Sequence, residues 1–517
     1  MPKTWIESTI AAPFHRGPEL WSCVVPTGLG SDSRTRKGKG SVGERAYDAD
    51  VIIIGGGPAG SALGGFLARD GIKTLIIEKD IHPRDHVGES LTPSTNLVFD
   101  KLGFLGKMND AGFIHKPGTG WNAPRSPLWR FIEIWLFEFP IPGGPQPYTY
   151  NVERDVMDTM LLRHAHELGA KVLQGVRVQK VLFEDGRAVG VRAQVTDGWE
   201  RDLYSKLVVD ATGRRCLLAT QLGMKEKDPN FNQFVIFSWF KGVKPPPKRY
   251  DGFTLFYFLG LNQGWSWHIP LRNGNASMGV VLDKNDFQKS GMSHEDFFYS
   301  LVKRNRTFEY AMQDAERIRP WWIEGDYSYK IDTFAGPGWL LVGDALRFVD
   351  PIFSSGVDVA LFSSQYAYET IKQAWETGNE EKAFSEYQDR VEVGVDYWYE
   401  LISMFYKLQN MVSRYATRPY WREQIVRVLQ GNPYIPETQE RARKLLDHMQ
   451  QTYENVMHDP GNLLRPWIMD PEMNHTITCP TCLGVADYVS DERSFVCRRC
   501  GSKAAYEQAQ SLAATRS

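Results

Sequence analysis

The order of apolar and polar positions predicts that the ordered part of the chain begins with a strand, a helix and a second strand. Four apolar residues at Val51–Ile54 predict a buried strand. A glycine-rich turn and an Ala/Leu-rich stretch, which predicts a helix, follow this strand. A second apolar run at Thr74–Ile77 ends at Glu78. This order predicts a βαβ unit and hence a parallel sheet.

Strand patterns dominate the middle of the chain, and helical patterns dominate its C-terminal part. The predicted strand regions are residues 128–150, 171–210, 232–283 and 340–344. A helix is predicted over residues 152–168. From Val357 to about residue 450 the pattern is helical, with breaks near Pro419 and Pro433. The polar, basic run at residues 31–41 predicts a flexible arm.

The composition is typical of a soluble globular protein of two or three domains. The 517 residues are 42% apolar and 24% charged, and the formal net charge is −2. This balance excludes a global field that attracts nucleic acid or an acidic membrane. The chain shows neither a membrane span of roughly 20 apolar residues nor the apolar core of a secretory signal. Six cysteines are few for this length, so we expect a reducing, cytoplasmic location.

Three glycines follow the first strand in the pattern GxGxxG. The first permits a tight turn, the second lets the backbone approach a pyrophosphate, and the third lets helix and strand pack closely. The next helix directs free N–H groups at the phosphates. Glu78 ends the second strand, where a carboxylate accepts hydrogen bonds from ribose hydroxyls. We assign to the dinucleotide Gly55, Gly57, Pro58, Ala59, Gly60, Glu78 and Lys79. A tight turn without a ligand is the alternative interpretation.

Further motifs make this site resemble that of flavoprotein monooxygenases of the hydroxylase type. Asp210-Ala-Thr-Gly213 and Gly343-Asp344 each follow an apolar strand. Arg154 and Asp158 on the predicted helix resemble the arginine-containing cofactor motif of that family. The resemblance implies FAD as the cofactor, with Asp344 at its ribitol chain and Arg154 in the same site.

Four segments resemble the flavin-dependent halogenases. They are Gly264-Trp-Ser-Trp-His-Ile-Pro270, which matches WxWxIP, His86-Val-Gly-Glu-Ser-Leu-Thr-Pro93, Ala111-Gly-Phe-Ile-His-Lys-Pro-Gly118, and Phe348-Val-Asp-Pro-Ile-Phe-Ser-Ser-Gly-Val357. The resemblance extends from about Asp48 to about Met411, and is greatest to halogenases of phenolic or pyrrolic substrates, including carrier-bound ones. For WxWxIP alone, a core strand is the alternative, since 16 Trp, 22 Tyr and 27 Phe also indicate a large aromatic core.

The resemblance to the halogenases implies a mechanism. Reduced FAD and O2 oxidise chloride or bromide to hypohalous acid, and Lys116 passes the halogen to an electron-rich ring. Trp265 and Trp267 lie beside the flavin and prevent direct hydroxylation. Lys116 hydrogen-bonds the hypohalous acid or becomes a haloamine, and either role favours a desolvated amine of lowered pKa. Glu89 orders the flavin side of the tunnel or moves protons.

The turn at Ser355–Val357 is the predicted halide and flavin site. Adjacent N–H groups form an anion-binding concavity. We assign Ser355 and Gly356 to halide, and Gly356 and Val357 to the flavin. Tryptophan halogenases have an acidic residue just before the serine of this motif, where this chain has Phe353 and Ser354. A phenol or pyrrole activates its own ring, so the lack of a carboxylate agrees with such a substrate.

The expected partners follow from the same resemblance. A second GxGxxG with an acid, which would hold NAD(P)H, is missing from the sequence. We therefore expect a separate flavin reductase to supply FADH2. The other partners are halide and an aromatic small molecule, free or bound to a carrier protein. A homodimer is compatible with the sequence.

Four of the six cysteines form two CxxC pairs near the C-terminus. The pairs Cys479/Cys482 and Cys497/Cys500 approximate the spacing of a structural zinc ribbon with four thiolate ligands. A redox role is the alternative, but the βαβ pattern of a thioredoxin does not surround these cysteines.

We therefore predict an α/β fold: an FAD-binding Rossmann-like core with an inserted β-sheet substrate domain, a helical C-terminal region and a small zinc ribbon. The predicted parts are a flexible arm at 1–47, the FAD-binding domain with its insertions at 48–360, the helical region at 361–470 and the ribbon at 471–517. A flavin hydroxylase, a prenyl-chain reductase and a non-catalytic FAD-binding protein are the rival functions. WxWxIP with Lys116 argues against the first two, and intact Gly55, Lys116 and Ser355 argue against the third.

Overall fold

A parallel sheet around the strand β1 (Ala49–Ile54) carries the predicted nucleotide-binding turn. The computed structural model describes residues 46–124, 126–195, 198–261, 263–325, 328–348, 350–409, 412–459, 476–478, 481–482, 485–489 and 494–505. Within these residues the first sheet has eight strands, with the order β19-β20-β10-β1-β2-β7, and β9 joins β10 to β8. The strands other than β1 are β2 (Thr74–Glu78), β7 (Lys171–Gln174), β8 (Val176–Glu184), β9 (Arg187–Val195), β10 (Glu200–Asp210), β19 (Ala335–Gly336) and β20 (Trp339–Leu341).

The sequence explains why β1 and β2 lie at the centre of this sheet. Both are short apolar runs, and nearly all their residues are buried. β1 pairs in parallel with β2 on one side and with β10 on the other. The helix α1 (Pro58–Arg69) begins with Pro58, which suits the first turn of a helix. Gly64 lets α1 approach β2, because a Cβ there would lie 2.5 Å from Ile76 Cδ1.

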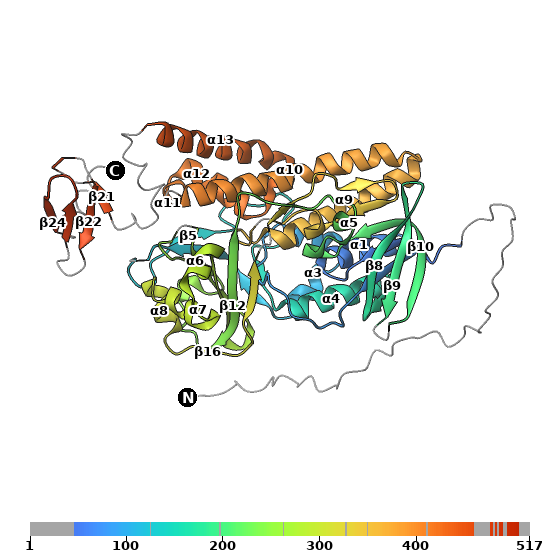
Figure 1. Ribbon diagram of the computed structural model, residues 1–517, viewed down its shortest axis with the longest axis horizontal. Helices are drawn as coiled ribbons and strands as arrows, with labels where there is room; N and C mark the ends of the chain where they lie inside the picture. Colours follow the sequence, from blue (N-terminus) through green and yellow to red (C-terminus); the bar gives the residue numbers. More distant parts are fainter. Residues whose placement is uncertain are drawn as a thin grey trace, which may run out of the picture. The chain divides into compact units, whose positions relative to one another are not determined.

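A second sheet forms the other wall of the predicted site. Its strand order is β16-β12-β15-β14-β13-β4-β5, and β17 also pairs with β12. Its strands are β4 (Gly118–Asn122), β5 (Ile132–Trp135), β12 (Gln233–Lys241), β13 (Thr254–Phe258), β14 (Trp265–Pro270), β15 (Asn275–Asp283), β16 (Glu316–Arg317) and β17 (Trp322–Gly325). Figure 1 shows the helices α6 (Lys284–Ser290), α7 (His294–Val302) and α8 (Arg306–Met312) beside it. Phe297, Phe298 and Phe308 of α7 and α8 join the apolar cluster of this sheet.

Short elements connect the two sheets and contribute to the site. The remaining strand pairs are β3 (Ile114–Lys116) with β6 (Thr149–Asn151) and β11 (Glu226–Lys227) with β18 (Tyr329–Lys330). The remaining helices before residue 350 are α2 (Thr95–Lys101), α3 (Leu105–Asp110), α4 (Arg154–Glu167) and α5 (Leu217–Gln221).

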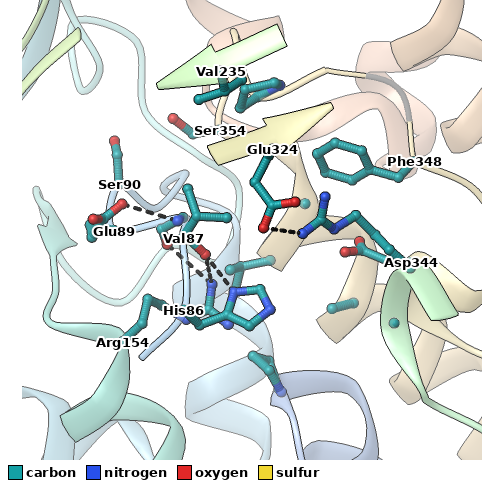
Figure 2. A pocket seen from close by; sticks show the side chains of 18 of the residues that line it. His86, Val87, Glu89, Ser90, Arg154, Val235, Glu324, Asp344, Phe348 and Ser354 are labelled. Carbon is teal, nitrogen blue, oxygen red and sulfur yellow. Dashed lines mark hydrogen bonds and ion pairs between the residues drawn. The ribbon is translucent and has the colours of Figure 1, made fainter. Parts of the chain in front are cut away.

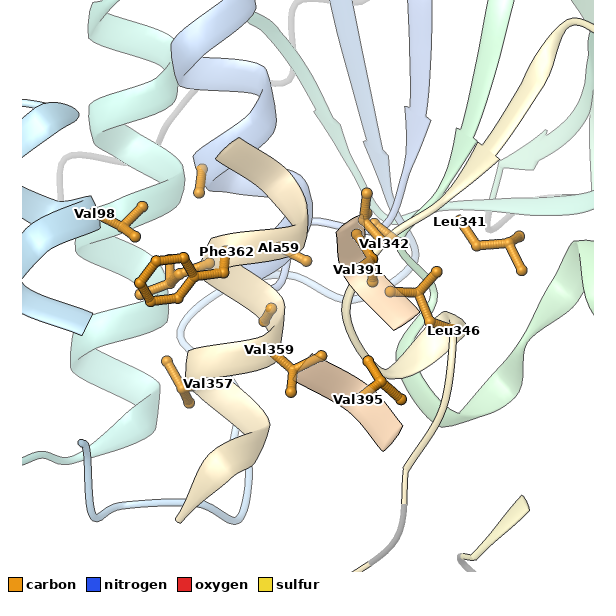
Figure 3. Packing of buried hydrophobic residues seen from close by; sticks show 14 of the residues in the cluster. Ala59, Val98, Leu341, Val342, Leu346, Val357, Val359, Phe362, Val391 and Val395 are labelled. Carbon is orange, nitrogen blue, oxygen red and sulfur yellow. The ribbon is translucent and has the colours of Figure 1, made fainter. Parts of the chain in front are cut away.

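Long helices form the C-terminal part of the described chain. They are α9 (Ser355–Thr377), α10 (Glu380–Lys407), α11 (Val412–Thr417), α12 (Pro419–Leu429) and α13 (Pro436–His458). Figure 3 shows Val359 and Phe362 of α9 in a core shared with Ala59 of α1 and with Val391 and Val395 of α10. The helix α9 thus packs between the first sheet's helix layer and α10. None of the described helices has the length and apolar character that a bilayer crossing requires.

The predicted α/β arrangement is confirmed, with local differences. The strand predicted over residues 340–344 ends at Leu341, and Asp344 lies in a 3-10 turn, Gly343–Ala345. Gly343 makes this turn possible because its φ is +62°. The breaks near Pro419 and Pro433 are confirmed: Pro419 starts α12, and Pro433 lies in the 3-10 turn Asn432–Tyr434. The domain boundaries stay predictions, and the predicted arm at 1–47 lies almost wholly outside the described residues.

The cysteine tail forms a small antiparallel sheet. Its order is β21 (Thr476–Thr478), β22 (Val485–Val489), β23 (Ser494–Cys497) and β24 (Lys503–Ala505). The Sγ atoms of Cys482, Cys497 and Cys500 lie within 4.8 Å of one another. Cys479 lies outside the described residues. The fold gathers three of the four predicted thiols, and the metal itself stays a prediction.

Candidate active site

The turn between β1 and α1 needs glycine at the first and third glycine positions of the GxGxxG pattern. Gly55 has a φ of +111°, and a Cβ there would lie 2.3 Å from Ala211 O. A Cβ on Gly60 would lie 2.0 Å from Gly55 O. Gly57 has a different surrounding, because a Cβ there would meet only Arg84 Nη2, at 3.4 Å. The turn therefore leaves space at Gly57, where the sequence predicts a pyrophosphate.

Charged groups beside this turn fit a dinucleotide. Glu78 at the end of β2 is buried, and its carboxylate accepts hydrogen bonds from Gly56 N at 2.6 Å and Asp80 N at 2.9 Å. Arg84 Nη1 is buried and lies 3.6 Å from Asp158 Oδ2, without a hydrogen-bond acceptor in the described chain. The other terminal nitrogen, Nη2, is the one that faces Gly57, where it is placed to donate to a phosphate. Lys79, in contrast, is exposed and pairs with Asp80 at 3.5 Å.

A cavity of about 150 Å³, here named the first cavity, opens beyond the turn. The predicted site residues that line it are Pro58, Ala59, Glu89, Arg154, Trp265, Trp267, Asp344, Gly356 and Val357. Segments far apart in the sequence thus meet around one space. Ser355 is buried and is not among the lining residues, whereas its neighbour Ser354 is. Ser354 precedes α9 with a φ of +57°, so the first turn of α9 begins at the cavity wall.

Two arginines face this cavity, and sequence reasoning found only one of them. Arg154 is buried, forms an ion pair with Asp158 at 2.8 Å, and donates to Val87 O at 2.7 Å. Arg214 pairs with Glu324 at 2.8 Å. Arg214 directly follows the Asp210–Gly213 motif, and that position is the signal by which it could have been found. Glu324 carries no such signal, because only the folding of β17 brings it here.

Burial raises the pKa of Asp344 to about 6, against the opposing effect of Arg214 and Arg154. Figure 2 shows this carboxyl group facing the cavity, near Glu324 and Phe348. A carboxyl group in this position can hydrogen-bond a hydroxylated chain in either protonation state. Such a group suits the ribitol of a flavin better than it suits a phosphate.

The aromatic side of the cavity is fixed by buried hydrogen bonds. Trp239 Nε1 donates to Glu89 Oε1 at 3.0 Å, and Trp267 Nε1 donates to Ser277 Oγ at 3.0 Å. The rings of Trp265 and Trp267 are 5.9 Å apart. Each indole N–H has an acceptor, so the rings are held in defined positions rather than in a loosely packed wall.

Lys116, the last residue of β3, is separated from the first cavity by the side chain of Ser90. Its Nζ donates to Ser90 Oγ at 2.8 Å and to Leu91 O at 2.9 Å. Ser90 lines the first cavity. The side chain of Lys116 is only 4% exposed, and burial lowers its pKa from 10.5 to about 7. A large share of this amine is therefore neutral near neutral pH.

A second cavity, of about 70 Å³, lies on the other side of the wall that includes Phe256. Phe256 lines both cavities. Thr119 of β4, three residues after Lys116, lines the second cavity, and its hydroxyl donates to the carbonyl of Thr254, which lines the first. The helices α10 to α13 supply most of the remaining wall, including Phe405, Leu445 and Met449. Lys116 itself lines neither cavity: its hydrogen-bond partner Ser90 lines the first, and Thr119, three residues further along the chain, lines the second.

The residues fit FAD on three observations from different elements. The turn leaves room at Gly57, the half-buried Arg84 directs its Nη2 at this turn, and the first cavity continues from the turn to two fixed tryptophans. Such an arrangement can hold a long planar cofactor whose ring end meets an aromatic wall. A small species released at that wall could then reach a buried amine.

Comparison with known proteins agrees with this geometry. A family described as "FAD binding domain" matches residues 48–390. A chlorinase of 1H-pyrrole-2-carbonyl-peptidyl-carrier protein from Pseudomonas fluorescens is 37% identical over 445 residues, which cover 83% of this chain and 98% of the relative. A brominase of the same kind of substrate from Pseudoalteromonas luteoviolacea is 34% identical, over 74% of this chain and 91% of the relative.

A solved structure shows the same fold. The flavin-dependent brominase Bmp2 superposes with a TM-score of 0.69 and 29% identity, over 78% of this chain and 99% of that one. The expected resemblance is therefore confirmed over most of the chain. By sequence and fold together, the protein belongs to the FAD-binding family over residues 48–390 and is an enzyme of the flavin-dependent halogenases.

Proposed function

We propose that this halogenase transfers chlorine or bromine from hypohalous acid, by way of Lys116, to a pyrrole or phenol ring held in the second cavity. The two relatives just described act on a pyrrole-2-carbonyl group bound to a peptidyl carrier protein, so a carrier-bound pyrrole is the favoured substrate. FADH2 is supplied by a separate flavin reductase. A homodimer and a cytoplasmic location stay predictions.

The single observation that carries the proposal is the environment of Lys116. Its Nζ is buried and held by Ser90 Oγ and Leu91 O; Ser90 lines the first cavity, and Thr119, three residues further along the chain, lines the second. The pKa of about 7 leaves a lone pair free to take up halogen. An amine in bulk water would be protonated and open to competing reactions.

The first cavity supplies the oxidised halide. Arg84, Arg154, Glu78 and Asp344 would hold FAD, which when bound supplies the reduced flavin that, with O2, oxidises halide to hypohalous acid. The backbone of Gly356 and the hydroxyl of Ser354 at the start of α9 offer donors to a halide. We keep the predicted Ser355–Gly356 turn as the halide site, with Ser354 as the side chain that reaches the cavity. Trp265 and Trp267 keep the acceptor ring out of this cavity.

The second cavity suits a neutral ring that activates itself. Its described lining residues include neither a carboxylate nor a basic side chain, and the polar members are Thr119, Trp121 and Tyr415. Phe353, which with Ser354 stands where tryptophan halogenases have an acidic residue, is among the apolar ones. Electrophilic substitution there must draw electrons from the ring's own nitrogen or hydroxyl. This agrees with a pyrrole or phenol rather than an indole that needs a carboxylate.

Mass spectrometry tests the substrate proposal. The purified protein is mixed with FAD, a flavin reductase, NADH, oxygen and either chloride or bromide. The acceptors are a pyrrole-2-carbonyl carrier protein, free pyrrole-2-carboxylate and a set of phenols. We expect the halogen isotope pattern on the carrier-bound pyrrole. Oxygen incorporation would indicate a hydroxylase, and halogenation of the free acids alone would contradict the carrier-bound substrate.

Replacement of Lys116 tests the transfer role. We expect Lys116→Ala to lower the halogenated product by about 100-fold or more, because acid–base or nucleophilic groups contribute on this order. FAD binding and flavin reoxidation should stay near the wild-type level. Product formation by the wild-type protein should rise as pH increases through about 7, because the amine loses its proton there. Lys171→Ala, on exposed strand β7, is the control. Loss of FAD binding in Lys116→Ala would overturn this role.

The buried amine should also lower the stability of the protein. Below its folded pKa of about 7 the folded state carries a desolvated charge, and this cost fades as pH rises toward 10.5, where the unfolded lysine also loses its proton. We expect Lys116→Met to raise the free energy of unfolding by a few kcal/mol at about pH 6 and by clearly less at about pH 9.5. Urea unfolding at both pH values measures this. An equal gain at both would contradict a titrating buried amine.

We also propose that the cysteine tail binds a structural zinc ion. Cys482 Sγ and Cys497 Sγ are 3.5 Å apart, close to the roughly 3.8 Å of two thiolates on tetrahedral zinc. The backbone N–H groups of Arg499 and Cys500 donate to Cys497 Sγ at 3.4 and 3.5 Å, as in a thiolate-binding turn. Cys479, three residues before Cys482, supplies a fourth thiol in the sequence.

Metal analysis tests this proposal. We expect about one zinc per chain in the purified protein, and its loss in Cys500→Ser, because four-thiolate sites need every ligand. Cys216→Ser, a buried cysteine outside the tail, is the control and should keep the metal. Wild-type protein without zinc that still resists proteolysis in the tail would contradict the proposal.

A further inference from the structure

We propose that Tyr406 is a positioning residue that closes the wall between the two cavities. This inference rests on the proposed function, because it concerns how oxidised halide is kept on its way to Lys116. Tyr406 lies near the end of α10, in the helical region that the cofactor motifs do not include. We define the partition as Phe256, Trp265 and the segment from Asp350 to Ser354.

The hydroxyl group of Tyr406 links both sides of the partition. Trp265 Nε1 donates to Tyr406 Oη at 2.9 Å, and Tyr406 Oη donates to Asp350 Oδ2 at 2.8 Å. Trp265, Asp350 and Tyr406 are 1%, 2% and 7% exposed. Asp350 Oδ1 also accepts from Ile352 N at 3.0 Å, so the carboxylate orders its own turn. In a dry setting, each of these bonds is costly to leave unmade.

The linked groups belong to both cavities. Trp265, Pro351 and Ser354 line the first cavity, whereas Ile352 and Phe353 line the second. The Trp265 ring meets the edge of Phe256, which lines both, with ring centroids 5.6 Å apart. One tyrosine hydroxyl therefore ties strand β14 to the turn that precedes α9, and both form the partition.

A second contact ties Tyr406 to the acceptor side. Its ring packs against Phe405, with centroids 5.3 Å apart, and Phe405 lines the second cavity. Phe405 of α10 thus lines the second cavity, and the next residue, Tyr406, holds Trp265 of the first cavity in place. Hypohalous acid is small and neutral, so a wall that shifts lets it escape without meeting the amine. The geometry makes Tyr406 responsible for retention of the oxidised halide rather than for its formation.

The test is the fate of oxidised halide in Tyr406→Phe, with FAD, reductase, NADH, oxygen and bromide. We measure the halogenated acceptor formed per flavin reoxidised and the halogen caught by a water-soluble β-diketone trap. We expect the halogenated acceptor formed per flavin reoxidised to fall by about fivefold or more. The trapped halogen should rise by a matching amount, and the rate of flavin reoxidation should stay unchanged. An unchanged ratio would overturn the proposal.

Two other tyrosines of α10 provide matched controls. Tyr397 is buried, and its hydroxyl has no hydrogen-bond partner in the described chain, so Tyr397→Phe removes a hydroxyl without breaking a bond. Tyr387 Oη donates to Leu341 O at 2.6 Å, away from the partition, so Tyr387→Phe breaks one buried bond elsewhere. Both should keep the wild-type ratio. A fall of similar size in Tyr387→Phe would assign the effect to general loss of stability and contradict a positioning role.

A measurement on the FAD-free protein distinguishes a failure of this inference from a failure of the proposed function. In the protein free of FAD, amide hydrogen exchange over the segment from Asp350 to Ser354 should be faster in Tyr406→Phe than in Tyr397→Phe. Equal exchange would overturn the link between Tyr406 and the partition. Wild-type protein that forms no halogenated ring would instead refute the proposed function, whatever the exchange result.

Discussion

Desolvation of the Lys116 amine is the constraint on which the rest of the site depends. A charged ammonium group is costly to bury, so it remains inside a protein only where acceptors meet it or where it loses its proton. Both occur here, since Ser90 Oγ and Leu91 O accept from Nζ and burial lowers the pKa to about 7. The same contacts fix the direction of the nitrogen, because Ser90 and Leu91 belong to the segment that lines the first cavity.

The two sheets contribute different parts of the site around Lys116. The parallel sheet supplies the glycine turn, Glu78 and the start of α9, which suit a dinucleotide. The second sheet supplies Trp265, Trp267 and Phe256, of which Phe256 lines both cavities. Because the groups sit on strands and helix ends, their positions are set by backbone pairing rather than by mobile loops.

The helices α9 to α13 connect the parts of the site that the two sheets supply. The helix α9 begins at Ser355, directly after the cavity-lining Ser354, and packs on α1 and α10 further along. The helix α10 then returns to the partition through Tyr406 and to the acceptor cavity through Phe405. One helix therefore contacts both the second cavity and the tryptophan of the first, through neighbouring residues.

The sequence by itself determined the elements whose pattern is local. The GxGxxG turn, the strands Val51–Ile54 and Thr74–Ile77 and the helical C-terminal region follow from spacing along the chain. The segments around Lys116 and Trp265 are identified by their resemblance to the halogenases. Only the tertiary structure decided that Glu324 meets Arg214, that Phe256 divides two cavities and that Tyr406 receives the N–H of Trp265. Tyr406 and Trp265 are 141 residues apart, and a contact over that separation leaves no periodic signal. The physical reason is that spacing reports which face of an element is buried, whereas pairing of buried polar groups depends on how distant elements pack.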